Sequence, residues 1–281
     1  MIRRQVVIGA GVMGEVLVGA AKKSGHEVLI VEADPTRAAE VAKGHQVKAV
    51  DLAAALADSD QDTAIWLAVK PQQIGQLLKE IEAQLSATPP QARPLFVSLA
   101  AGVGAGEIAQ VAPSITRLVR VMPNTPARIG RGVTAVVSTP SGNSPAPSAQ
   151  DLALVEQLLT PLGSTEEVTE TEVDAVTVIS GSGPAYLFYL AEAMVEAAVS
   201  LGLSAEVATR LVNETLSGSA ELLRVSNSLA NKLRNDVTSK GGVTLAATSY
   251  LDDNAIKSHL VAAIAAAHER AKEMARVSSN S

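Results

Sequence analysis

Gln5-Val6-Val7-Ile8-Gly9-Ala10-Gly11-Val12-Met13-Gly14 is a short apolar run that leads directly into three glycines spaced Gly-x-Gly-x-x-Gly. A helical pattern follows the last glycine, and a second apolar run at 27–31 ends in Glu32, 18 residues beyond Gly14. Strand, glycine loop, helix, strand and acidic residue in this order are the fingerprint of a dinucleotide-binding Rossmann unit. This opening segment therefore predicts an α/β fold that binds a dinucleotide.

Each glycine of the loop has its own expected task. Gly9 permits the tight turn, Gly11 lets a pyrophosphate approach the backbone, and Gly14 lets the helix pack closely on the strand. The cofactor-binding residues predicted in this segment are Gly9, Ala10, Gly11, Val12, Met13 and Gly14.

Glu32 bears on which dinucleotide is bound. A carboxylate at the end of the second strand can bind both ribose hydroxyls of NAD, and it would repel the 2′-phosphate of NADP. The basic residues nearby in the sequence are Arg37 and Lys43. Glu32 could instead mark an ordinary exposed strand end. The residues favour NADH over NADPH as the cofactor.

Three more buried strands are expected at 63–69, 95–99 and 117–122, each followed by small or polar residues. Ligands of an open parallel sheet bind at the carboxyl ends of its strands, so these segments should line the cofactor crevice. Each segment could also be a plain turn, with Lys70 a solvated lysine. The crevice residues predicted from them are Ala68, Val69, Lys70, Pro71, Ala100 and Ala101.

The character of the chain changes near residue 168. A surface loop rich in Ser, Pro, Gly and Asn at 139–147 precedes a helix at 151–162 and a last strand at 164–168. Beyond that strand the chain is rich in alanine and helical. We therefore expect a Rossmann domain at 1–168 and an all-helical domain at 169–281.

Helices are expected in the second domain from Pro184 onward, at 205–223, after Gly242 and at 254–274. The helices are built from small apolar residues and make a thin domain by themselves. Burial in a symmetric homodimer is therefore expected.

The segment 237–246, Val-Thr-Ser-Lys-Gly-Gly-Val-Thr-Leu-Ala, places hydroxyl residues and two glycines directly before a helix. Glycines at a helix N-terminus let backbone N–H groups converge on an anion such as a carboxylate or phosphate. An ordinary Ser/Gly helix cap is the alternative interpretation.

The composition of the 281 residues narrows the classes of function. The formal net charge is -6 and aromatic residues make up 2%, which is unlike a nucleic-acid binder. The chain has no cysteine, and its four histidines are scattered, so no metal site is expected. No apolar run is long enough to span a membrane, and a cytoplasmic protein with a small-molecule substrate is predicted.

Six motifs in order along the whole chain resemble the pyrroline-5-carboxylate reductase family, which completes proline synthesis. They are Gly9–Gly14, Ala68–Gln72, Ala101–Val103, Val121–Pro126, Ser180–Tyr186 and Leu233–Ala246. The resemblance implies a Rossmann domain joined to a helical dimerisation domain, with dimers that can assemble into rings. It also implies NADH or NADPH as cofactor.

The resemblance further implies a substrate site between the nicotinamide and the loop 238–244, with that loop supplied by the partner subunit. Ser239, Gly241, Gly242 and Val243 would hold the substrate carboxylate, and Thr244 would place its hydroxyl near the ring nitrogen as the catalytic residue. Glu170 resembles an acid of the family at the substrate site.

Three departures from the family pattern are visible. Lys240 stands where the family usually has proline, and Asn235-Asp236 varies the polar pair before the loop. Glu32-Ala33-Asp34 stands where many members carry small or basic residues that accept NADP. The first two bear on substrate affinity and the third on cofactor choice.

Two other functions stay open from the residues alone. A β-hydroxyacid dehydrogenase also joins a Rossmann domain to helices, but it uses a helical lysine, for which Lys232, Lys240 and Lys257 are the candidates. A non-catalytic protein that senses a dinucleotide is the other alternative.

Overall fold

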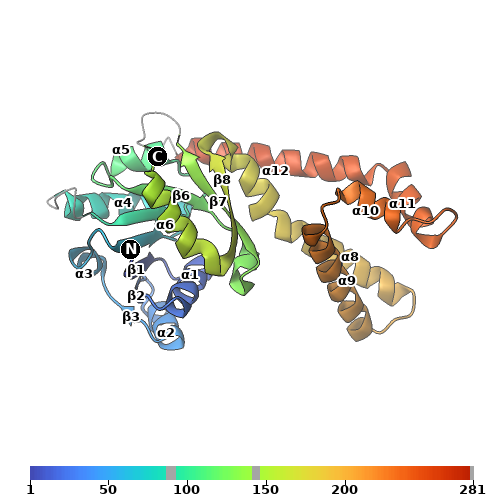
Figure 1. Ribbon diagram of the computed structural model, residues 1–281, viewed down its shortest axis with the longest axis horizontal. Coiled ribbons are helices and arrows are strands. Elements are labelled where there is room, and N and C mark those ends of the chain that lie inside the picture. Colours follow the sequence, from blue (N-terminus) through green and yellow to red (C-terminus); the bar gives the residue numbers. More distant parts are fainter. Residues whose placement is uncertain (87–92, 141–145, 279–281) are drawn as a thin grey trace. The chain divides into compact units, whose positions relative to one another are not determined.

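The computed structural model describes residues 1–86, 93–140 and 146–278 (Figure 1). The chain forms two compact units: Met1–Ser182 together with His268–Ser281, and Gly183–Ala267. The predicted boundary at 168 coincides with the end of the sheet, whereas the second compact unit begins at Gly183. The division into domains at 168 stays a prediction.

The first unit is built on one sheet, whose eight strands in the described residues have the order β3-β2-β1-β4-β5-β6-β7-β8. Neighbouring strands are parallel except β6 and β7, which are antiparallel. The strands are β1 (Arg4–Ile8), β2 (Glu27–Val31), β3 (Lys48–Ala49), β4 (Thr63–Leu67), β5 (Leu95–Ser98), β6 (Leu118–Met122), β7 (Gly132–Thr139) and β8 (Gly163–Thr169).

Alternation along the strands sends side chains into two cores. On β1, Val7 belongs to a core that includes Leu17 of α1, whereas Val6 and Ile8 belong to a core that includes Leu78 of α4. The helices of this unit that join the strands are α1 (Val12–Lys23), α2 (Pro35–His45), α3 (Leu52–Ala57), α4 (Pro71–Leu85), α5 (Ala105–Val111) and α6 (Ala149–Leu159).

Trp66 of β4 lies at the centre of this sheet and is fully buried. Its indole Nε1–H donates to Oε1 of Gln5 at 2.7 Å, and Nε2 of Gln5 lies 2.9 Å from Nδ1 of His26. A buried indole needs such an acceptor, because an unpaired N–H in the core would lose its hydrogen bond to water.

The sequence predicted the fold class correctly and missed parts of the sheet. The expected strands correspond to β1, β2, β4, β5, β6 and β8, but β3 and the long β7 were not expected. The predicted helix at 151–162 ends earlier, at Leu159, and a 3₁₀ turn at Thr160–Leu162 follows because Pro161 cannot continue an α-helix. Of the expected loop 139–147, residues 141–145 lie outside the described residues and Thr139 ends β7.

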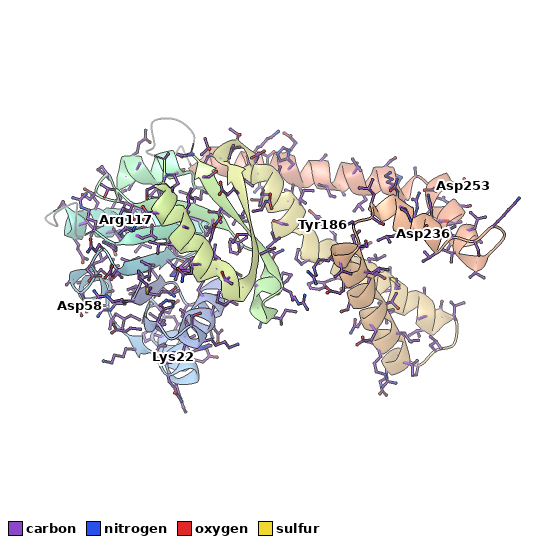
Figure 2. The ribbon with its side chains drawn as sticks, in the orientation of Figure 1. Lys22, Asp58, Arg117, Tyr186, Asp236 and Asp253 are labelled. Atoms are coloured by element: carbon purple, nitrogen blue, oxygen red, sulfur yellow. The ribbon has the colours of Figure 1, made fainter. Side chains whose placement is uncertain are left out.

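A short helical link follows β8, namely a 3₁₀ turn η4 (Glu170–Glu172), α7 (Val173–Val176) and a π-helical turn η5 (Thr177–Gly181). The remaining helices are α8 (Gly183–Ser200), α9 (Ala205–Val225), α10 (Ala230–Asp236), α11 (Val243–Asp253) and α12 (Ile256–Ser278), whose last turns belong to the first unit. The sequence predicted these helices apart from α7 and α10. In Figure 2, Tyr186 marks α8 and Asp236 marks the end of α10.

The second unit buries few of its apolar side chains. Among its described residues, Ala208 and Val212 of α9 are the buried hydrophobic ones. Large apolar side chains elsewhere in the unit stay exposed, including Phe188 at 64% and Leu201 at 85%. Exposed apolar area on this scale is typical of a surface that another protein covers.

The close backbone approach between Gly163 and Gly132 in the sheet can be tested by substitution. A Cβ on Gly163, whose φ is +133°, would lie 2.0 Å from the carbonyl oxygen of Gly132. Gly163→Ala should therefore lower the free energy of unfolding by about 3 kcal/mol or more, measured by chemical denaturation. Gly75→Ala is the matched control: its Cβ would meet nothing within 4 Å inside α4, so it should stabilise by up to about 1 kcal/mol. Equal stabilities of the two variants would contradict the observed contact.

Candidate functional site

The glycine loop after β1 is held between the two neighbouring strands. The N–H of Gly9 donates to the carbonyl of Val31 at the end of β2, and the N–H of Ala68 donates to Ile8, both at 2.8 Å. Gly9 has φ +95°, and a Cβ there would lie 2.8 Å from the backbone of Ala68. A Cβ on Gly14 would lie 1.8 Å from the carbonyl oxygen of Gly9. Both positions therefore require glycine, for the turn and for the close approach of α1.

Gly11 differs from the other two glycines because a Cβ there would meet nothing within 4 Å. It is the N-cap of α1 and provides no side-chain hydrogen bond to the helix. The first N–H groups of a helix lack partners within the helix, so those of α1 are available to an anion. Open space over uncapped amides is what a pyrophosphate needs, and the loop fits a dinucleotide on this ground.

Glu32 lies beside the same loop. Its Oε2 accepts a hydrogen bond from the N–H of Ala10 at 2.6 Å, and its Oε1 accepts from the N–H of Asp34 at 3.0 Å. Glu32 is thus held at the carboxyl end of β2, next to the first turn of the glycine loop. A ribose at this position would meet a negative charge.

Arg37, in the first turn of α2, also reaches this loop. Its Nε donates to the carbonyl oxygen of Ala10 at 2.9 Å. Its Nη1 pairs with Glu40 at 2.9 Å, and its Nη2 pairs with Glu15 of α1. The hydrogen bond to Arg37 is the main reason that the pKa of Glu15 is lowered, which favours the ionised form of this carboxyl.

The predicted residues after β4 and β5 lie at the same edge of the sheet. Lys70 is the exposed N-cap of α4, with Pro71 in the first turn, and makes no side-chain cap hydrogen bond. Ala100 is buried, and its N–H donates to the hydroxyl of Ser98 at 3.3 Å. Lys70 therefore lies at the start of α4, which no side chain caps, just as Gly11 lies at the uncapped start of α1.

Asn124 is a residue that the sequence placed in a motif but did not single out. Its Nδ2 donates to the carbonyl of Ser180 in η5 at 3.1 Å, and its Oδ1 accepts from the N–H of Val133 in β7 at 3.0 Å. The nearly buried amide thus fixes the loop after β6 to two other elements. A lone Asn between two prolines after a buried strand was the available signal.

Glu170 forms a buried ion pair with Arg120 of β6, and both side chains are 7% exposed. Its Oε1 also accepts from the N–H of Ala105 at 3.4 Å, whereas its Oε2 is buried without a partner among the described residues. Arg120 was not predicted, since its partner is 50 residues away in sequence. The contacts give Glu170 a positioning role between β6 and α5, and direct contact with substrate stays a prediction.

The loop before α11 belongs to the second unit. Gly241 has φ +72°, Lys240 keeps a negative φ, and the N–H of Gly242 donates to the carbonyl of Ser239 at 3.0 Å. These features define a type II turn. A Cβ on Gly242 would lie 2.4 Å from Oγ of Ser239. Gly241 is thus required by its positive φ, whereas at Gly242 a rotation of the Ser239 hydroxyl would relieve the shortest contact.

The start of α11 is open in the same way as that of α1. Gly242 is its N-cap and makes no side-chain cap hydrogen bond, and Val243 is 90% exposed. Thr244 is half-buried in the first turn. The residues predicted to bind the substrate carboxylate therefore surround a helix N-terminus that no side chain caps. Because this loop and the cofactor loop belong to different units, their approach stays a prediction.

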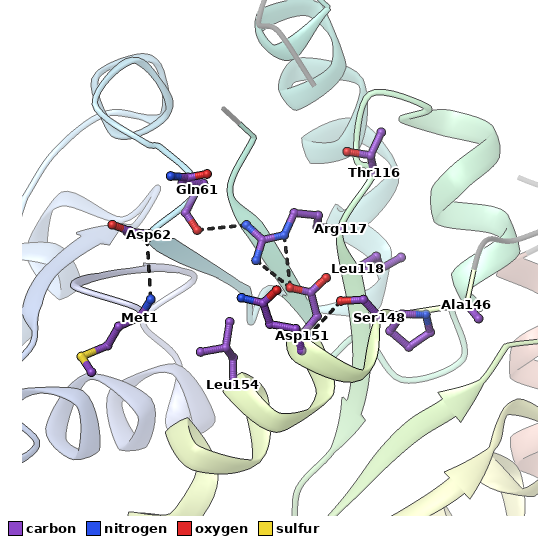
Figure 3. A pocket seen from close by; sticks show the side chains of 12 residues that line it. Met1, Gln61, Asp62, Thr116, Arg117, Leu118, Ala146, Ser148, Asp151 and Leu154 are labelled. Atoms are coloured by element: carbon purple, nitrogen blue, oxygen red, sulfur yellow. Dashed lines mark hydrogen bonds and ion pairs between the residues drawn. The ribbon is translucent and has the colours of Figure 1, made fainter. Parts of the chain in front are cut away.

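A cavity of ≈ 550 Å³ lies at the opposite edge of the sheet, beside the amino ends of β1, β4 and β6 (Figure 3). Arg117 donates to Oδ1 of the buried Asp151 at 3.1 Å from Nε and 2.6 Å from Nη2, and to the carbonyl of Gln61 at 2.9 Å. The charges are paired with one another, and the cavity contains none of the predicted site residues. Its network joins the start of α6 to the sheet.

Two further properties concern the described residues as a whole. No group of three or more histidine, aspartate or glutamate side chains among them is placed to hold a metal ion. None of their helices combines the length and apolar character that a membrane span requires.

Comparison with known proteins gives the family. Residues 170–274 match the family model for pyrroline-5-carboxylate reductase dimerisation, and residues 4–102 match the model for coenzyme F420-dependent NADP oxidoreductases. A pyrroline-5-carboxylate reductase from Mycobacterium tuberculosis is 34% identical over 96% of each chain. The chain belongs to the pyrroline-5-carboxylate reductase family.

Solved structures of this family agree with the fold. The pyrroline carboxylate reductase of Plasmodium falciparum, solved with NADP bound, has a TM-score of 0.80 and 27% identity, and covers 97% of this chain and 99% of its own. The Streptococcus pyogenes reductase has a TM-score of 0.83 and 26% identity, with 96% and 98% covered. The Rossmann domain followed by helices, predicted from the sequence, is therefore confirmed.

The type II turn predicts the effect of restoring proline at Lys240. Proline is favoured at the second position of this turn, and it reduces the conformational freedom of the unfolded chain. Lys240→Pro should stabilise the loop by about 0.4–1 kcal/mol, seen as slower amide hydrogen exchange at Gly242. Lys240→Ala is the control and should leave exchange unchanged. Faster exchange in the proline variant would mean that the turn is not of this type.

Proposed function

We propose that this chain reduces 1-pyrroline-5-carboxylate to L-proline with a reduced nicotinamide dinucleotide. The observation that carries the proposal is the match to reductases of this activity over 96% of the chain. The two uncapped helix starts, at Gly11 and Gly242, support it, because the reaction needs one site for a pyrophosphate and one for a carboxylate.

The chemistry is a transfer of hydride to a C=N bond and of a proton to its nitrogen. A bound reduced nicotinamide supplies the hydride, and water supplies the proton. In this proposal, Gly9, Gly11 and Gly14 seat the dinucleotide on α1, while Ala100 and Ala101 leave room beside the ring. Asn124 keeps the neighbouring loop in place through its bonds to Ser180 and Val133.

The substrate carboxylate is assigned to the loop before α11. The hydroxyl of Ser239 and the amides of Gly241 and Val243 offer donors to an anion, and the helix N-terminus adds favourable charge. The N–H of Gly242 already donates to the carbonyl of Ser239, so Gly242 contributes to the site through the turn that it closes. Lys240 is exposed, so its ammonium adds at most a weak attraction.

Thr244 is proposed to act on the ring nitrogen. A hydroxyl is a poor acid at neutral pH, so its role is to orient the imine or to relay a proton from water to that nitrogen. Its place in the first turn of α11 is next to the groups that are proposed to donate hydrogen bonds to the substrate carboxylate. The protein thus contributes alignment of the reacting atoms.

The protein is proposed to act as a homodimer, with each site completed by the partner's loop. The exposed apolar side chains of α8, α9 and α11 support a partner, as does the match to a dimerisation family. A ring of dimers and a cytoplasmic location are further proposals that come from the resemblance and the sequence.

NADH is proposed as the preferred cofactor. The carboxylate of Glu32 would accept hydrogen bonds from ribose hydroxyls and repel a 2′-phosphate. The relative from Plasmodium falciparum was solved with NADP, which concerns that protein. The alternative of a β-hydroxyacid dehydrogenase is not favoured, because the relatives that match over the full length are reductases of the imine.

Removing the Thr244 hydroxyl tests its role. Thr244→Ala should lower turnover with pyrroline-5-carboxylate by about tenfold or more, with the dissociation constant for NADH unchanged. Turnover is followed by the absorbance of the reduced nicotinamide, and NADH binding by calorimetry. Thr244→Ser keeps the hydroxyl and should retain most activity. A Thr244→Ala enzyme as fast as the parent would remove Thr244 from the mechanism, and NADH binding without any turnover in the parent would favour a sensor.

Replacing Glu32 tests cofactor choice. Glu32→Gln keeps an acceptor for the N–H of Ala10 and removes the charge, so NADPH should bind about tenfold more tightly relative to NADH. Glu27→Gln, at the start of β2, removes a charge elsewhere and should leave the ratio unchanged. A parent enzyme that already prefers NADPH would refute the preference for NADH.

A further inference from the structure

Arg37 is a cation held against the glycine loop, yet two carboxylates restrain it. Its guanidinium contacts Glu15 of α1 and Glu40 of α2, and Nε donates to the carbonyl of Ala10. The side chain of Arg37 is 27% exposed. All three of its nitrogens are therefore engaged by neighbouring acceptors.

The same peptide segment connects Arg37 to Glu32. Glu32 accepts from the N–H of Ala10, and Arg37 donates to the carbonyl of the same residue. Both charged groups are thus hydrogen-bonded to the glycine loop, beside the carboxylate that would meet a ribose. An arginine at this location is the group that usually accommodates a 2′-phosphate.

Glu15 has a further electrostatic consequence. It lies in the first turn of α1, where a negative charge stabilises the helix but opposes a bound pyrophosphate. Pairing with Arg37 offsets that charge, and Nε2 of His45 lies 3.3 Å from the same carboxylate. The pair therefore serves the dinucleotide as well as joining α1 to α2.

We propose that Glu15 and Glu40 are specificity-determining residues that hold Arg37 away from a 2′-phosphate, so that NADPH is disfavoured by both Glu32 and the restraint on Arg37. This inference rests on the proposed function, because it concerns the dinucleotide that the reductase uses. The two carboxylates act through Arg37 and are positioning residues. A purely structural role as a link between α1 and α2 would change stability without changing the choice of cofactor.

The test compares dissociation constants for NADH and NADPH, measured by calorimetry without substrate. The reference is Glu32→Gln, so that a released Arg37 has no carboxylate at position 32 to pair with. Adding Glu15→Gln and Glu40→Gln to this reference should lower the dissociation constant for NADPH about a further fivefold. The dissociation constant for NADH should stay close to that of the reference. Each of the two substitutions alone should give part of the effect, which covers the case that their combination folds poorly.

Two controls make the result specific. Adding Arg37→Ala to the triple variant should abolish the gain for NADPH. Glu27→Gln with Glu80→Gln, added to the reference, removes the same charge from exposed sites away from the loop and should have no effect on the ratio. An unchanged ratio in the triple variant, or a gain that survives Arg37→Ala, would overturn the inference.

The proposed function fails in a distinguishable way. If the parent protein binds neither dinucleotide, the reductase proposal falls and the inference falls with it. If the parent binds NADH more tightly and turns over pyrroline-5-carboxylate, but releasing Arg37 changes nothing, only the inference falls.

Discussion

The backbone contact between Gly9 and Ala68 is the constraint on which the candidate site depends. It joins the loop after β1 to the end of β4, and Gly14 brings α1 against the same loop at a distance that no side chain permits. These two approaches leave Gly11 as the open position over the start of α1. Without them the helix could not direct its free amides to one point, and Glu32 and Arg37 would lose their shared contact with Ala10.

The parts of the fold that follow from local patterns could be predicted from the sequence. The glycine spacing and the apolar runs predicted β1, β2 and the strands after them, because buried parallel strands are continuous apolar segments. The antiparallel β7 was missed: Gly132–Thr139 carries a strand composition, but its place between β6 and β8 depends on tertiary pairing. The two-residue β3 is too short to give a pattern.

The residues of the candidate site also divide into those that local sequence predicts and those that depend on tertiary contacts. Gly9, Gly14 and Gly241 could be selected from sequence because each is required by a turn or a close approach. Arg120 could not, since its partner is 50 residues away along the chain. Asn124 offered only its place between two prolines, and its bond to Ser180, 56 residues away, appears only in the fold. Only folding shows that Glu170 neutralises Arg120, or that Arg37 is restrained by Glu15.

The position of Trp66 has a practical consequence. It is the one tryptophan of the chain and lies in the buried sheet of the first unit, whereas the three tyrosines, Tyr186, Tyr189 and Tyr250, all belong to Gly183–Ala267. Indole emission therefore reports on the Rossmann sheet alone. The loss of structure of this sheet on heating can therefore be followed by itself, without an added label and without a contribution from an indole in the helical unit.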